Sequence, residues 1–486
     1  MIKTLKTLTL GILIVSSLQA GAKETNHLKE CWDKQVKPIK EKHLAFTYQE
    51  KLNELYHSSE PWQQMYYTGS GAIWCNAHDF AQQDTFLIRK HTQYSKTQFN
   101  EDELLFQDYG DKDISPVTHS MFSGEIIKTA RYTPVLLINY FLKEKIAEGK
   151  ETDDQFAVYK TVINETVVKL YIRKADDLLV KATALDNDEL RGDVLSTFIY
   201  MGYTNMGGLY YPKTIQIEKV NSKVIDEVAI TSANKVKHAP FLLEKPAGYT
   251  IKEDIEPQKQ IKVEKYNDHI YFMDVMPAGA KIMLVEFSDF LLVAEAPRNS
   301  QNGELIIKEA NNIAPGKPIK YFAFGHHHPD YLGGMRAFIH KGATVLSVKD
   351  DKDYVTYLAS APHTLKPDSL YIQPMPLKME EVKDSTTITD GTYKMKMYVI
   401  GKQSGHTKDY LIYYFPQEKL VFEDDLVWIQ KTGPAKKAGE TQAGLYKAMS
   451  DLNLDVQTII QSWGISYDNY KTVIPITDMI ESMSIK

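Results

Sequence analysis

Three consecutive histidines have the residue types and the spacing of a metal-binding loop. The segment contains His326, His327 and His328, with Asp330 two residues later and a Gly-Gly pair at 333–334. In an extended loop, residues i and i+2 point the same way, so His326 and His328 are expected to converge. Neutral imidazole nitrogens are common ligands of zinc. The segment therefore predicts metal chemistry, in which a cation activates water and polarises a carbonyl or ester oxygen.

The flanking residues predict the elements that position these histidines. Residues 320–324 and 343–348 predict short buried strands, and residues 335–340 predict a helix between them. The histidines then lie on the loop that follows a strand, where mixed α/β proteins place their ligands. Pro329 is expected to keep this loop from coiling into a helix.

His-x-His-x-Asp followed by Gly-Gly resembles the metal motif of the metallo-β-lactamase fold superfamily. The resemblance extends over residues 262–486, through Gly405-His406 and a predicted hairpin that ends at Asp425. It implies an αβ/βα four-layer domain over residues 261–486, a mixed fold unlike that of the first half of the chain.

The resemblance also implies a set of metal ligands. His326, His328 and His406 would bind one ion, with Asp425 as its acidic ligand. Three neutral imidazoles and one carboxylate suit zinc, with iron as the alternative. Asp424 stands where the family usually has a small residue, so either aspartate can point inward, and the register favours Asp425.

Two positions depart from the two-metal pattern of that superfamily. Tyr331 stands at a histidine position, and Trp463 falls near the place of the final histidine. One metal is therefore expected, unless Tyr331 ionises. Asp330, released from metal binding, is expected to orient or deprotonate a water molecule. Tyr331 is expected to donate a hydrogen bond to developing oxyanion charge.

Two functions remain open at this point. The first is a metal-dependent hydrolase of an ester, amide or lactone. The second is a non-catalytic envelope protein that binds a ligand and carries a degenerate metallo-β-lactamase-like domain. The three histidines of the first site favour the hydrolase, whereas Tyr331 and Trp463 favour the binding protein. In both cases the expected partner is a small or lipid-like molecule.

Residues 23–235 predict an α+β domain with a curved antiparallel sheet. A helical lead-in is expected over 23–60, a strand at 66–74, and a helix over 124–148 that Pro134 interrupts. Further strand-like runs follow at 156–163, 166–174, 178–184, 194–203, 213–220 and 223–230. The segment 192–233 resembles the last strands of a lipoprotein-carrier-like half-barrel, which implies a cavity for an apolar molecule. Residues 236–260, rich in proline and charge, predict a linker.

The first 22 residues predict a signal peptide. Lys3 and Lys6 precede the apolar run 8–18, and Ala20-Gly21-Ala22 is typical of a cleavage site. No later run reaches the roughly 18 apolar residues of a membrane helix, so we expect a soluble periplasmic or secreted protein. The net charge of -6 over 486 residues makes nucleic acid a poor partner. Cys31 and Cys75 would meet oxidising conditions, and the sequence leaves their pairing open.

Overall fold

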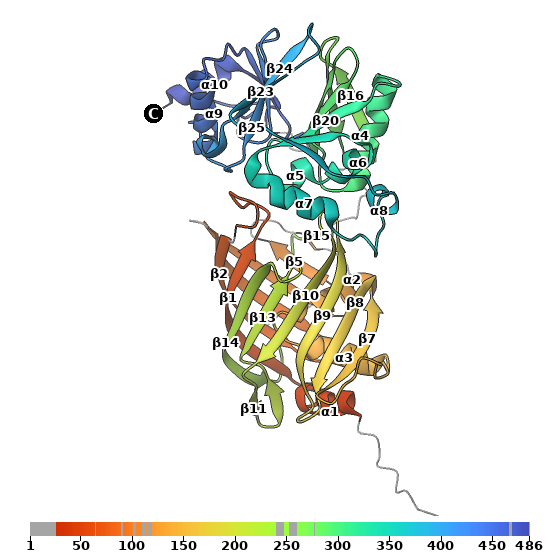
Figure 1. Cartoon of the computed structure of the whole chain (residues 1–486). Helices are drawn as coiled ribbons and strands as arrows, with labels where there is room; N and C mark the ends of the chain where they lie inside the picture. Colours follow the sequence, from red (N-terminus) through yellow and green to blue (C-terminus); the bar gives the residue numbers. More distant parts are fainter. Residues whose placement is uncertain are drawn as a thin grey trace, which may run out of the picture.

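The structure is a computed structural model in which the described residues form two lobes (Figure 1). The described residues are 26–63, 65–88, 91–100, 104–108, 113–114, 119–239, 247–251, 260–276, 278–465 and 469–485. The predicted signal peptide lies outside them. Within these ranges, every helix is too short or too polar to cross a membrane. We call residues 26–239 the N-terminal lobe and residues 260–485 the C-terminal lobe.

The N-terminal lobe is built on one 11-stranded sheet, in the order β5-β4-β3-β2-β1-β14-β13-β10-β9-β8-β7. All neighbouring strands in it are antiparallel. Its strands are β1 (His43–Glu54), β2 (Met65–Cys75), β3 (Phe80–Ile88), β4 (His91–Phe99), β5 (Leu104–Asp108), β7 (Phe156–Ile163), β8 (Thr166–Arg173), β9 (Leu178–Asp188), β10 (Gly192–Met201), β13 (Thr214–Lys219) and β14 (Val224–Val236).

Helices pack on this large sheet, and short strand pairs lie at its margins. The helices are α1 (His27–Gln35), η1 (Lys37–Ile39), α2 (His119–Thr129) and α3 (Val135–Lys143), and the paired short strands are β11 (Thr204–Met206) with β12 (Leu209–Tyr211) and β15 (Thr250–Ile251) with β6 (Asp113–Ile114). As predicted, Pro134 separates two helices. The strand alternation of buried and solvent-facing side chains, clearest in β8, creates the apolar face that the helices cover.

The structure corrects the predicted helical lead-in and shows the state of the two cysteines. The helical lead-in ends at Ile39, because residues 43–54 form β1. Leu44, Phe46 and Tyr48 are buried at every second position, which is the period of a strand. Cys31 and Cys75 are both buried free thiols, so the structure contains no bridge between them.

The C-terminal lobe contains two sheets. The seven-stranded sheet has the order β16-β17-β18-β19-β20-β21-β22, and the six-stranded sheet the order β23-β24-β25-β26-β27-β28. Their strands are β16 (Ile261–Lys265), β17 (Ile270–Val275), β18 (Ala280–Glu286), β19 (Leu291–Ala294), β20 (Ile319–Ala323), β21 (Thr344–Ser347), β22 (Lys378–Glu381), β23 (Ser385–Thr389), β24 (Lys394–Val399), β25 (Leu411–Phe415), β26 (Leu420–Glu423), β27 (Thr458–Gln461) and β28 (Val473–Pro475).

Apolar clusters separate four layers in this lobe. One cluster lies between the two sheets and joins side chains such as Met283 and Phe415. A second packs the seven-stranded sheet against helices that include Phe338, and a third packs the six-stranded sheet against helices that include Leu445. The helices are α4 (Ser300–Ile313), α5 (Pro329–Leu332), α6 (Met335–His340), η2 (Lys349–Asp351), α7 (Lys352–Ser360), α8 (Ser369–Ile372), η3 (Gly401–Ser404), α9 (Glu440–Asp451) and α10 (Ile476–Ser484). The layers follow the expected helix–sheet–sheet–helix order.

The two lobes meet through loops at one end of the large sheet. The connection between β1 and β2, which we call the β1–β2 loop (residues 55–63), rises from the red strands toward α5 and α7 in Figure 1. On the same side, the Asp193 carboxylate accepts the backbone N–H groups of Thr364 (2.8 Å) and Leu365 (3.1 Å). Leu190 is buried in the apolar cluster of the C-terminal lobe. The N-terminal lobe is therefore docked against the ends of strands that carry the predicted site.

Candidate metal centre

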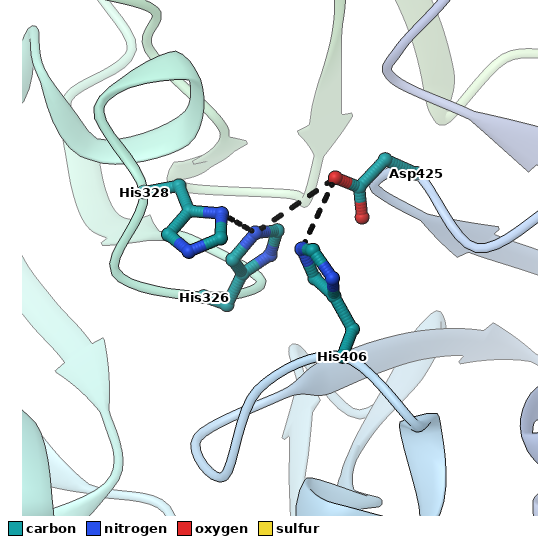
Figure 2. A group of neighbouring side chains, drawn as sticks. All are labelled: His326, His328, His406 and Asp425. Carbon is teal, nitrogen blue, oxygen red and sulfur yellow. Dashed lines mark hydrogen bonds and ion pairs between the residues drawn. The ribbon is translucent and has the colours of Figure 1, made fainter. Parts of the chain in front are cut away.

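Four side chains predicted to bind one metal lie together in the C-terminal lobe (Figure 2). One nitrogen or oxygen atom from each of His326, His328, His406 and Asp425 lies within 4.8 Å of the others. His326 Nε2 is 2.9 Å from His328 Nδ1, and Asp425 Oδ2 is 3.4 Å from His406 Nε2 and 4.0 Å from His326 Nε2. The structure thus brings together residues separated by about a hundred positions in the sequence.

Ends of strands from both sheets position these groups. His326 and His328 follow β20 of the seven-stranded sheet, and Asp425 follows β26 of the six-stranded sheet. Gly325 lets these two segments approach each other, because a Cβ atom at this position would lie 2.2 Å from Asp424 Oδ2. The expectation for Pro329 was wrong. The proline begins α5, since its missing N–H is no loss in the first turn of a helix.

Hydrogen bonds at the outer ring nitrogens set the tautomers of two histidines. His326 Nδ1 lies 2.7 Å from Asp424 Oδ2, and His328 Nε2 lies 2.9 Å from the backbone carbonyl oxygen of Ser58. The Ser58 carbonyl can only accept, so His328 carries its hydrogen on Nε2, and His326 carries its hydrogen on Nδ1 when Asp424 Oδ2 is the acceptor. The inner nitrogens, His326 Nε2 and His328 Nδ1, then present lone pairs to each other. Such a pair repels in the absence of a cation and is the donor arrangement that a metal requires.

The electrostatics keep these ligands in their metal-binding forms. Burial, and next the charge on neighbouring imidazoles, lowers the pKa of His328 to about 3 and the pKa of His326 well below its ordinary value. Burial opposes ionisation of Asp425, but His406, His328 and Tyr331 outweigh it and hold the pKa of that carboxyl below its usual range. Neutral imidazoles and an ionised carboxylate are the states that bind a cation.

Asp424 and Asp425 have different tasks. Asp425 is the aspartate in the group of four, which agrees with the register preferred from the sequence. Asp424 is fully buried, and its carboxyl is hydrogen-bonded to His326 Nδ1 instead. Burial, and then the charges of Glu295, Asp425 and Glu423, raises the pKa of Asp424 well above its ordinary value. A hydrogen-bonded carboxyl group beside a ligating histidine is a common way to orient the ring.

Two tyrosines pack on the His326 ring. Tyr410 stacks on it with ring centroids 4.8 Å apart, and its hydroxyl accepts the backbone N–H groups of Asp424 and Asp425. Tyr331 lies 4.5 Å from the same ring and is fully buried. Burial, reinforced by the nearby carboxylates, raises the pKa of Tyr331 well above its ordinary value. Burial thus favours the neutral phenol, which is the form that binds metal poorly.

Asp330 is not part of the group of four. Its carboxylate accepts a hydrogen bond from the Tyr56 hydroxyl and pairs with Arg298 at 3.4 Å. Its proposed action on a water molecule stays a prediction. Trp463 packs against Trp428, with ring centroids 4.3 Å apart, and its backbone N–H donates to the Asp424 carbonyl at 2.8 Å.

His327, the middle histidine, belongs to a second buried cluster. Its backbone N–H and Nδ1 lie 2.7 and 3.0 Å from Asp409 Oδ2, and Asp351 completes the group. Burial, and next the charge of Asp409, raises the pKa of Asp351 well above its ordinary value. The pKa of Asp409 is lowered despite burial, because the charge and the hydrogen bonds of His327 outweigh the effect of burial. These three side chains form a second group whose ligand atoms lie within 4.8 Å of one another.

Sequence reasoning missed three residues of the N-terminal lobe. All three lie in the β1–β2 loop. Tyr56 contacts Asp330, and His57 contacts His328. Ser58 contacts both His327 and His328. No local motif marks them, since a backbone carbonyl leaves no signature in the residue type. Only the aromatic and histidine content of this short loop could have drawn attention to it.

Removal of the Asp424 carboxylate is expected to weaken metal binding without removing a ligand. An Asp424→Ala variant leaves His326 Nδ1–H without its acceptor, so the ring is free to rotate or change tautomer. We expect the dissociation constant for zinc to rise about 10- to 100-fold. Chelator competition measures this change. Asp455→Ala, which removes an exposed carboxylate paired with Lys419, should leave the constant unchanged.

Known structures resemble this chain only in part, at low identity and low TM-score. No known family model matches the sequence, and no curated protein does. Among solved structures, a metallo-β-lactamase from Pontibacter korlensis is similar, with 16% identity, a TM-score of 0.34, and coverage of 46% of this chain and 98% of that one. The mono-zinc form of the metallo-β-lactamase FIM-1 from Pseudomonas aeruginosa has 17% identity and a TM-score of 0.33, and the match covers 46% of this chain and 93% of that one. Rubredoxin oxygen:oxidoreductase from Desulfovibrio gigas has 14% identity and a TM-score of 0.32, and the match covers 46% of this chain and 61% of that one. Likenesses at this level do not assign a family, so the function has to be inferred from the site itself.

Proposed function

We propose that this protein is a metal-dependent hydrolase of an ester, amide or lactone, with a single metal site at His326, His328, His406 and Asp425. The main support is the convergence of four ligand atoms within 4.8 Å, with the inner nitrogens of His326 and His328 2.9 Å apart. Zinc suits three neutral imidazoles and one carboxylate, with iron as the alternative. The pattern expected for a second metal is incomplete because Tyr331 and Trp463 stand where that pattern has histidines.

The surrounding side chains suit hydrolytic chemistry. When bound, the metal would lower the pKa of water toward about 7 and polarise the substrate oxygen. His406 and Asp425 keep 18% and 16% of their side chains exposed, whereas His326 and His328 are buried, so substrate would approach over the first pair. Asp330 would accept the proton that water releases. Tyr331, whose single hydroxyl hydrogen helps to hold Asp425 ionised, would redirect it to negative charge on the substrate oxygen.

Metal analysis of the purified wild-type protein tests this proposal. We expect about one equivalent of zinc, loss of ester or lactone hydrolysis after chelation, and recovery when zinc is added back. A folded wild-type protein that contains no metal and binds none on titration would contradict the proposal. Parallel titration with iron distinguishes the two candidate ions.

A ligand-binding role for the N-terminal lobe is the second candidate. A cavity of about 390 Å³ lies between α2 and the large sheet, and its lining includes three aromatic residues and two basic ones, Phe80, Phe99, Phe198, Arg131 and Lys219. Aromatic walls with a few charged groups are typical of sites for small organic ligands. A wild-type protein that binds no metal but takes up an apolar fluorescent probe in this cavity would favour the second candidate over the first.

We also propose that residues 1–22 direct export to the periplasm or the medium. The support is the basic start, the short apolar run and the small residues at Ala20-Gly21-Ala22. N-terminal sequencing of the mature protein should then begin at Lys23. Recovery of the full-length chain from the cytoplasm only would contradict this.

A further inference from the structure

We propose that the β1–β2 loop of the N-terminal lobe is a positioning element of the metal centre, an inference that depends on the metal site proposed above. The Ser58 carbonyl accepts the outer N–H of His328, so a group from one lobe fixes a ligand in the other. The metal affinity of the C-terminal lobe then depends on the docking of the N-terminal lobe.

Ser58 is held at the site by contacts with both neighbouring histidines. Its carbonyl oxygen lies 2.9 Å from His328 Nε2, and its hydroxyl oxygen lies 3.2 Å from His327 Nε2. All three side chains are buried. The ring of His57 lies edge-on to His328, with centroids 5.6 Å apart. The loop therefore contacts the side of His328 that faces away from His326.

This carbonyl determines which nitrogen of His328 is available. With the hydrogen on Nε2, the lone pair is on Nδ1, the atom that faces His326. Without the carbonyl, the ring is able to flip or to move its hydrogen to Nδ1, and each change removes the ligand atom from the site. Partners of this kind orient metal-binding histidines, and their loss typically lowers metal affinity 10- to 100-fold.

Other contacts of the β1–β2 loop dock it on the C-terminal lobe. The Trp62 ring packs edge-on against Tyr354 and Tyr357, with centroids 5.0 and 4.9 Å apart. Glu60 forms an ion pair with Lys408, whose backbone N–H donates to the Ser59 carbonyl at 2.8 Å. None of these contacts involves a proposed metal ligand.

Within the loop, Gln63 Oε1 accepts hydrogen bonds from the Ser59 backbone N–H and hydroxyl, at 2.9 and 2.6 Å. These bonds hold the residue next to Ser58, so the loop carries its carbonyl in a defined direction. By linkage, if docking strengthens metal binding, then a bound metal strengthens docking by the same factor.

A double variant, Glu60→Ala with Trp62→Ala, tests the proposal because it undocks the loop and leaves every proposed ligand in place. In the full-length protein, we expect the dissociation constant for zinc, measured by chelator competition, to rise about 10- to 100-fold. We also expect a changed visible absorption spectrum of the Co²⁺-loaded protein, since the spectrum reports ligand geometry. If the double variant fails to fold, Gln63→Ala, which loosens the loop from within, is expected to shift the constant in the same direction.

A control variant outside the loop accompanies the test. Val162→Ala changes an exposed residue on β7, at the far edge of the same sheet, and should leave the constant and the Co²⁺ spectrum unchanged. A folded double variant with wild-type affinity and spectrum overturns this inference and leaves the hydrolase proposal standing. A wild-type protein that binds neither zinc nor Co²⁺ overturns both.

Discussion

Replacement of His406 with alanine is expected to reduce zinc affinity about 100-fold or more and to reduce hydrolysis to the rate of the metal-free protein. His406 is the one imidazole of the group that comes from the segment before β25, and its Nε2 lies 3.4 Å from Asp425 Oδ2. Zinc sites of four ligands bind with about 10–16 kcal/mol, so one ligand accounts for roughly 3 kcal/mol. That loss corresponds to about two orders of magnitude in the dissociation constant.

Titration with zinc and metal analysis after dialysis measure this effect. His78→Ala is the matched control, since His78 is an exposed histidine outside both buried clusters. The control should keep the wild-type zinc content and rate. Equal zinc content in the His406→Ala variant and the wild type would show that the cation, if present, is held elsewhere.

An Arg336→Met variant is expected to lower the free energy of unfolding of the C-terminal lobe by about 3–5 kcal/mol. Arg336 is almost fully buried and forms a two-point ion pair with Asp368, Nε to Oδ2 at 2.6 Å and Nη2 to Oδ1 at 2.9 Å. Its Nη1 also donates to the carbonyls of Leu358 and Ala359. Methionine fills similar space but leaves a buried carboxylate and these carbonyls without their donor, which is the costly case for a buried pair.

Urea unfolding, followed by tryptophan fluorescence, measures the loss. Arg173→Met, in an exposed pair with Asp176, is the matched control and should change the free energy by less than about 1 kcal/mol. An Arg336→Met variant as stable as the control would show that water replaces the guanidinium, and the assignment of this pair to the stability of the lobe would be wrong.

The same pair predicts the pH dependence of stability. Burial opposes ionisation of Asp368, but the hydrogen bonds and charge of Arg336 outweigh it and lower the pKa of that carboxyl. The stabilisation is therefore complete above the ordinary aspartate pKa of about 4 and is lost as the pH falls through the lowered value in the folded protein. The Arg336→Met variant should lose less stability than the wild type between pH 5 and about pH 3.

Local patterns predicted the elements around the site well. The apolar run before the histidines is β20, and the helix expected at residues 335–340 is α6 with the same bounds. The alternation of side-chain direction in an extended loop predicted that His326 and His328 converge, and their inner nitrogens do lie close together. His406 and Asp425 were found only through a family resemblance, because their contact with His326 depends on how two sheets pack.

The errors and omissions have physical causes. Residues 43–54 were expected to be helical, but their period of two buries Leu44 and Phe46 in β1. Pro329 was expected to prevent a helix and instead begins one. The Ser58 carbonyl and the Asp424 carboxyl act through contacts between distant segments, and such contacts depend on tertiary structure rather than on residue type.

The β1–β2 loop has a consequence for how this protein matures. Ser58 leaves the ribosome long before His328 and Asp425. The carbonyl that orients His328 is therefore synthesised well before the residues of the C-terminal lobe that it contacts. The proposed metal centre is complete only after both lobes have folded and joined. On that proposal, metal uptake would follow folding, and it would occur in the compartment where folding finishes rather than on the nascent chain.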